Sequence, residues 1–90
     1  MAKVSKFDRV LQHAREVKAR HEGDLMRRPG VVGVGVGLRR SGGELTDEVA
    51  IVVMVRNRAE IDALGPADAL PLEIEGVPID IQETGEISAH

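Results

Sequence analysis

The chain contains no cysteine, no tryptophan and no tyrosine, and a single phenylalanine stands among its 90 residues. Without cysteine there is no disulfide, no thiolate nucleophile, no iron–sulfur cluster and no thiolate zinc site. With so few aromatic rings the core must be aliphatic, and stacking on nucleic-acid bases has little to use. No apolar run approaches the roughly 18 residues of a membrane span, and the first ten residues lack the apolar centre of a signal peptide. We therefore expect a soluble, cytoplasmic protein.

Basic residues are also missing from the last third of the chain. All 12 Lys and Arg lie between Lys3 and Arg58, where seven acids leave a formal charge of +5. Residues 59–90 contain eight acids and no Lys or Arg, a formal charge of −8. Two interpretations follow. Either the two parts pack together and neutralise each other, or the basic side meets a partner or the acidic side of a neighbouring copy.

Residues 5–22 have the spacing of an amphipathic helix. Ser5 is suited to cap its start, with Asp8 three residues later in the position of a capping box. Gly23 is suited to end it in a left-handed conformation. Residues at spacings of three and four share one stripe, which we expect to pack on a sheet: Phe7, Val10, Leu11, Ala14, Val17 and His21.

Residues 31–38 read VVGVGVGL, a period of two that predicts a strand. One face would carry valines and a leucine, and the other would carry Gly33, Gly35 and Gly37. Glycine inside a strand costs about 0.5–1 kcal/mol relative to alanine. Such a row is sensible where another element comes very close. We therefore predict close packing at these three glycines, with the N-terminal helix as the candidate neighbour.

The rest of the chain predicts a second strand, a short helix and another pair of strands. Residues 48–56 include AIVVMV, apolar on both faces, so this strand should be central or otherwise covered and should close a hairpin over 31–56. Asn57 can cap a short helix over 58–64, a second hairpin follows at 72–83, and 84–90 is a polar tail. We expect one α+β domain over residues 1–90. It would be a two-layer sandwich ordered helix–strand–strand–short helix–strand–strand, with an antiparallel sheet covered by the N-terminal helix.

Motifs for catalysis or cofactor binding are not recognised. A dinucleotide fingerprint needs a glycine turn between a strand and a helix, whereas these glycines lie inside a strand that another strand follows. His13 and His21 are eight residues apart and lack metal-ligand spacing, and no serine occupies a nucleophile elbow. We therefore expect no enzyme activity, no catalytic residue, no metal site and no cofactor.

Six arginines near the expected strand ends are the candidate interaction residues: Arg27, Arg28, Arg39, Arg40, Arg56 and Arg58. They could meet a protein partner, a second copy of the chain or, as a less favoured alternative, nucleic acid. Overall acidity and the lack of aromatics argue against nucleic acid. A solvated, partly ion-paired rim is the simpler interpretation.

Two ordered stretches resemble a known domain: GVVGVGVGLRRSGGELTDEVAIVVMVRN and, further on, LPLEIEGVPIDIQETGE. The combination is similar to the small domain that precedes the trypsin-like peptidase domain in bacterial relatives of the plant NARROW LEAF-type peptidases, and covers roughly residues 29–86. The same order of elements is also similar to the pro-domains of some bacterial trypsin-like proteases. No peptidase domain accompanies the pattern here, so no catalytic residue is carried over. The resemblance implies a bacterial accessory domain standing alone.

These observations predict a non-enzymatic domain that self-associates into a homo-oligomer or mediates another protein–protein interaction. A domain of this size buries only about 60–65% of its unfolded surface, so association would add needed stability. The alternative is a binder of a protein partner, similar to a peptidase pro-domain, and the less favoured one is nucleic-acid binding through the basic half. We expect no membrane partner.

Overall fold

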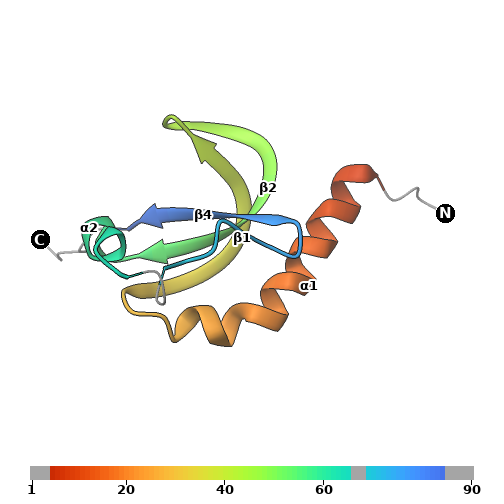
Figure 1. Cartoon of the computed structure of the whole chain (residues 1–90). Coiled ribbons are helices and arrows are strands. Elements are labelled where there is room, and N and C mark those ends of the chain that lie inside the picture. The colour runs from red at the N-terminus through yellow and green to blue at the C-terminus, as the bar shows by residue number, and fades with distance from the viewer. Residues whose placement is uncertain (1–4, 66–68, 85–90) are drawn as a thin grey trace, which may run out of the picture.

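The computed structural model describes residues 5–65 and 69–84. It is an α+β fold in which helix α1 (Lys6–Met26) packs on a four-stranded sheet. The strands are β1 (Val31–Ser41), β2 (Glu44–Val55), β3 (Glu73–Ile74) and β4 (Val77–Glu83), and the short helix α2 (Arg58–Asp62) follows β2. The predicted α+β class and order of elements are confirmed (Figure 1).

Helix α1 begins where the sequence predicts and ends later. The Asp8 amide donates to the Ser5 hydroxyl at 3.1 Å, and the Ser5 amide donates to the Asp8 carboxylate at 3.3 Å, which completes a capping box. The prediction that Gly23 ends the helix is wrong, because α1 continues through Met26. The chain turns instead near Gly30, whose φ is +81°. A single glycine weakens a helix by only about 1 kcal/mol, and packing on the sheet offsets this.

Both hairpins turn through two residues of positive φ. Gly42 and Gly43, at φ +59° and +84°, join β1 to β2, and Glu75 and Gly76, at φ +49° and +81°, join β3 to β4. Such turns match the right-handed twist of the flanking strands. Because the first turn needs only Gly42 and Gly43, the strands extend beyond the predicted bounds and reach it from both sides.

The sheet order is β1-β2-β4-β3, with β1 antiparallel to β2 and β3 antiparallel to β4. The expectation of a wholly antiparallel sheet is wrong for one pair, because β2 and β4 are parallel. Parallel neighbours need a long crossover, and the residues between β2 and β4, which include α2 and β3, provide one. The order makes β2 central, as its apolar sequence predicts, and leaves β1 and β3 at the edges.

The core lies between α1 and one face of the sheet. It is aliphatic, and its buried residues are Ala14, Val17, Leu25, Val49, Ile51, Val53, Val55, Ile61 and Val77. Valines of β1 pack against it from the same face, because Val34 pairs with Val53 and Val36 with Ile51. The valine face, and not the glycine face, is therefore the one that α1 covers.

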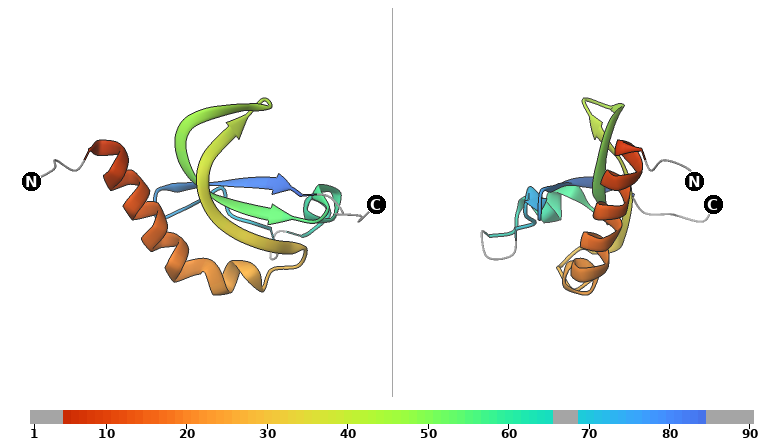
Figure 2. Two further views of the ribbon diagram at one scale, coloured as in Figure 1. Left: turned by 180° about the vertical axis from the view of Figure 1, so that it is seen from behind. Right: turned by 90° about the vertical axis from the view of Figure 1, so that its right-hand side faces the viewer.

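The hairpin β1–β2 curls strongly, so that its far end bends over the sheet (Figures 1 and 2). Register shifts between Val31 and Gly33 and between Leu38 and Arg40 mark bulges, which bend a strand and increase its twist. The bend brings the Arg40 amide to the Asp80 carboxylate of β4, at 3.0 Å. That hydrogen bond fastens the curled arm to the sheet.

The C-terminal part of the chain continues past β4. The predicted tail begins at Thr84, whose amide donates to the Val55 carbonyl at 2.9 Å, so the chain is still hydrogen-bonded to β2 one residue beyond β4. Residues 85–90 of the predicted tail lie outside the described residues.

Candidate interaction surfaces

The longest open edge of the sheet is strand β1. It has 11 residues, contains no proline, and has no charged residue between Val31 and Leu38. Edge strands expose unpaired N–H and C=O groups, and proteins usually blunt them with lysine, proline, β-bulges or short length. Between its two bulges β1 has none of these devices. In the left view of Figure 2, β1 runs in front of β2 and β4 with α1 beside it, and within the sheet it pairs on one side only, with β2.

The opposite edge is short and partly covered. Strand β3 has only two residues, and Pro78 of β4 lacks an amide proton. The Ile79 amide donates to the Leu72 carbonyl at 2.9 Å, and the Arg58 guanidinium donates to the Ile81 carbonyl at 3.3 Å. This edge therefore offers much less backbone for strand addition than β1 does.

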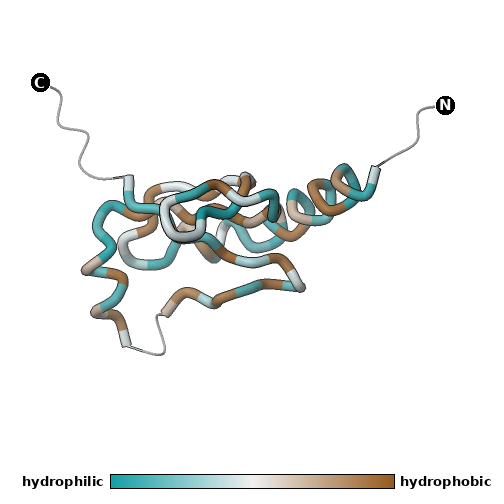
Figure 3. The backbone as a smooth tube through the Cα atoms, turned by 90° about the horizontal axis from the view of Figure 1, so that it is seen from above, coloured by the Kyte–Doolittle hydropathy of each residue, from teal (hydrophilic) through white to brown (hydrophobic). Residues whose placement is uncertain are grey.

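A second candidate is an open groove of about 700 Å³ between the first turns of α1 and the strands β2 and β4. Its apolar residues are Phe7, Val10, Val49, Val77 and Pro78. Phe7 is 50% exposed and Val10 is 43% exposed, although both belong to the stripe predicted to face the sheet. Phe7 and Val10 are exposed because the N-terminal end of α1 extends beyond the sheet (Figure 3). We name this surface the α1 groove.

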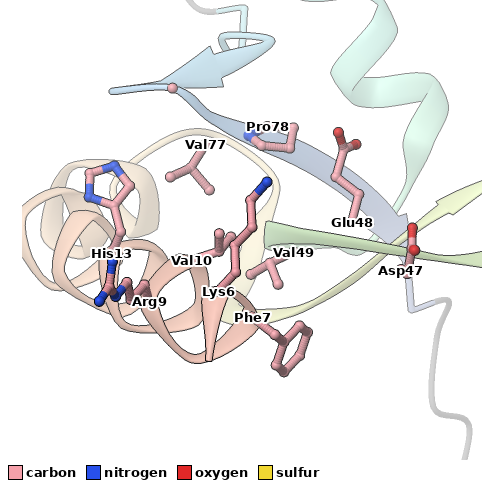
Figure 4. Close-up of a pocket in the computed structure, with 11 residues that line it drawn as sticks. Lys6, Phe7, Arg9, Val10, His13, Asp47, Glu48, Val49, Val77 and Pro78 are labelled. Carbon is pink, nitrogen blue, oxygen red and sulfur yellow. The ribbon is translucent and has the colours of Figure 1, made fainter. Parts of the chain in front are cut away.

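The two sides of the α1 groove differ in charge. Lys6 and Arg9 line it from α1, and Asp47 and Glu48 line it from β2 (Figure 4). Glu48 is paired with Arg39, 2.9 Å away. In the part of the chain that the structure describes, Lys6, Arg9 and Asp47 have no ion pair, so the groove has unpaired cations on one lip and an unpaired anion on the other.

The candidate arginines lie at several places, each with its own contacts. Arg39 pairs with Glu48 of β2. Arg40 and Arg58 line a polar hollow of about 570 Å³ between the curled hairpin and β4. Arg58 also lies 3.6 Å from the Asp62 carboxylate. In this hollow, arginine and carboxylate side chains are mixed.

The remaining three candidate arginines lie near the end of α1 and the end of β2. The Arg27 side chain donates to the Gly23 carbonyl at 3.1 Å, and Arg28 donates to the Ala69 carbonyl at 3.0 Å. The exposed Arg56 donates its backbone amide to the Gly30 carbonyl. Of these three, Arg28 alone has an ion pair among the described residues, with Asp24 at 3.5 Å, so this part of the rim is only partly paired.

The glycine row lies on the face away from α1, and its three positions are not equivalent. A Cβ at Gly33 would lie 2.8 Å from the Met54 Cε atom, and one at Gly37 would lie 3.4 Å from a Val52 methyl group. At Gly35 no heavy atom would lie within 4 Å, so the prediction of close packing fails there. The neighbours at Gly33 and Gly37 are side chains of β2.

One cluster that the sequence reasoning missed joins α1 to the second hairpin. The Arg20 guanidinium makes two hydrogen bonds to the Glu75 carboxylate, at 2.8 and 3.1 Å, and the His21 ring lies 2.8 Å from it. These contacts lower the pKa of Glu75 to about 2. The His13 ring lies 3.0 Å from the Glu75 carbonyl oxygen. Pairing of a helix with a distant turn has no local sequence signal. The one indication was His21, a polar residue on the helix stripe predicted to face the sheet.

The described residues offer neither a metal site nor a membrane-spanning helix. Within 5–65 and 69–84, no group of three or more His, Cys, Asp or Glu side chains is placed to hold a metal ion. Neither described helix combines the length and the apolar character needed to cross a bilayer. No protein-family model matches the chain, and no curated protein matches it significantly.

Proposed function

We propose that this chain is a non-enzymatic domain that self-associates by pairing strand β1 with β1 of a second copy. The observation that supports it most is the open edge of β1: a long, apolar, glycine-rich strand without proline or charge over residues 31–38. Antiparallel pairing about a twofold axis would join two sheets into one of eight strands. Each copy would present the same surface, as a twofold contact requires.

The energetics favour this pairing in three ways. New backbone hydrogen bonds would satisfy the outer N–H and C=O groups of both β1 strands, which are otherwise open to water. Val32, which is 50% exposed, would lose part of its contact with solvent. A domain with a thin aliphatic core also gains apparent stability from any association that the unfolded chain cannot make.

The resemblance to the N-terminal domain of bacterial NARROW LEAF-type trypsin-like peptidases supports the same general role of an accessory domain. A strand from another protein could add to β1 by the same hydrogen bonds, and that is the alternative of a pro-domain-like binder. Three of the six arginines, Arg28, Arg39 and Arg58, are ion-paired within the chain. This weakens the case for nucleic-acid binding, which needs one continuous basic face.

The test is the molecular mass of the pure protein by size exclusion with light scattering. Gly35→Lys adds a charge at the middle of the edge, where a Cβ meets nothing within 4 Å, so the fold should survive. Like charges facing each other in the paired strands should dissociate the assembly. Leu72→Lys is the matched control, because Leu72 is 90% exposed beside the other edge.

We expect the parent and Leu72→Lys to share one multimeric mass and Gly35→Lys to fall to a smaller species. Circular dichroism should show all three folded. A monomeric parent, or a folded Gly35→Lys chain with the parent's mass, would overturn the proposal.

A further inference from the structure

We infer that the α1 groove is a second self-association interface, occupied by the same groove of another copy about a twofold axis. In this contact, Phe7 of each copy lies in the groove of the other, against Val49, Val77 and Pro78. The inference goes beyond the pairing of β1 strands and does not depend on it, because the two surfaces share no residue.

The apolar stripe of α1 is covered by the sheet along only part of its length. Ala14, Val17 and Leu25 on α1 are buried by the chain's own sheet. Phe7 and Val10 continue the same face toward the N-terminus, yet the sheet leaves them half exposed beside an open volume of about 700 Å³. Phe7 is the only aromatic residue of the chain, and a lone exposed ring next to an apolar groove is a suitable anchor for a protein contact.

The charges identify the occupant. A ligand of the α1 groove must offer an anion to Lys6 and Arg9 on one lip and a cation to Asp47 on the other. A second copy related by a twofold axis meets both demands, because Arg9 of each copy then faces Asp47 of the other. The apolar anchor is duplicated by the same symmetry.

Two different twofold contacts on one chain predict an assembly larger than a dimer. Copies joined alternately through β1 and through the α1 groove would form a closed tetramer or a longer array. Blocking either contact alone should leave a dimer held by the other, and blocking both should leave a monomer. This pattern separates a failure of the groove interface from a failure of the β1 pairing.

The decisive experiment exchanges the charges of the groove in the Gly35→Lys background and in the parent chain. Arg9→Glu places an acid against Asp47 of the other copy, and Asp47→Lys places a base against Arg9. Each variant alone should weaken groove dimerisation on the order of 10-fold or more, because both symmetric contacts become repulsive. Arg15→Glu is the matched control, since it makes the same charge change on the same helix outside the groove.

Mixing the two variants gives the most specific readout. In a mixed pair, the introduced glutamate faces the introduced lysine and the native Asp47 faces the native Arg9, so both contacts are attractive. Sedimentation should show dimers in the mixture and weakened association in each variant alone, with Arg15→Glu like its background. Unchanged association of the folded single variants, or a mixture no stronger than its components, would overturn the inference. If the α1 groove binds a different protein or peptide instead, the folded single variants should associate as their background does.

Discussion

Alanine substitutions at Gly30 and Gly35 should change the stability of the fold in opposite directions. They therefore test which glycine the backbone conformation requires. Gly35 has no positive φ, and a Cβ there would meet no heavy atom within 4 Å. Gly35→Ala should therefore stabilise the fold by about 0.4–1 kcal/mol, mainly by restricting the unfolded chain. Gly30 has φ +81°, and a Cβ would lie 3.0 Å from the Ile61 Cδ1 atom.

At Gly30 the left-handed backbone costs an L residue about 1–2 kcal/mol, and the buried Ile61 must also shift. After the gain from the restricted unfolded chain, Gly30→Ala should destabilise the fold by about 1–2 kcal/mol. The two variants would then differ by about 2 kcal/mol, which corresponds to a gap in Tm of about 8–16 °C in a domain of this size.

The assay is thermal unfolding followed by circular dichroism at one protein concentration, because association also raises Tm. Both variants should retain the parent's far-ultraviolet spectrum before melting. If Gly35→Ala melts well below the parent at matched concentration, another element covers the glycine face and the assignment of faces is wrong. If Gly30→Ala melts at the parent's temperature, the turn before β1 is not held in its left-handed geometry.

Two further predictions concern charge. Because the pKa of Glu75 is lowered to about 2, the stability that its ionised form contributes is present above about pH 4.5 and is lost as the pH falls toward 2. In acid unfolding, Glu75→Gln should therefore lose less stability than the parent between pH 5 and pH 2. The control variant Glu73→Gln should follow the parent. Equal acid sensitivity of all three chains would contradict the pairing of Glu75 with Arg20. Salt should act differently on the two proposed contacts, since the Debye screening length shortens from about 10 Å at 0.1 M to about 3 Å at 1 M. In sedimentation at 0.05 and 1 M sodium chloride, association of the parent chain should weaken with salt, because its groove contact includes ion pairs. An Arg9→Glu chain, whose groove charges repel, should lose no mass at 1 M. The reverse order would exchange the roles of the two surfaces.

Much of the fold could be predicted because its signals are local. The Ser5 cap, the two-residue period of 31–38 and the Asn57 cap each act over a few residues, and each appears where expected. The apolar sequence of β2 favours a central strand in the same way, and β2 does lie between β1 and β4, although Val52 and Met54 on the face away from α1 are only partly buried.

The errors concern relations between distant segments. Sequence alternation divides β1 into a valine face and a glycine face, but only the pairing of Val34 with Val53 and Val36 with Ile51 decides which one α1 covers. Likewise, the parallel pairing of β2 with β4 depends on where the crossover returns the chain, which no local pattern determines. The α1 groove was missed for the same reason. The helical period places Phe7 and Val10 on the inner stripe, and does not show that the sheet ends before it reaches them.

The division of charge along the sequence also acquires a structural meaning from these contacts. Acids of the last third are engaged within the chain: Glu75 by Arg20, Asp80 by the Arg40 amide, and Glu83 by the Arg58 amide at 2.8 Å. These contacts support the interpretation in which the two parts neutralise each other inside one copy. A contact between copies must then use charges left unpaired, and in the α1 groove these are cations of α1 and Asp47, all from the basic part of the chain. If the copies associate through charge, the opposite charges that meet are therefore those on the two sides of the α1 groove. They are not the basic part of one copy and the acidic last third of another.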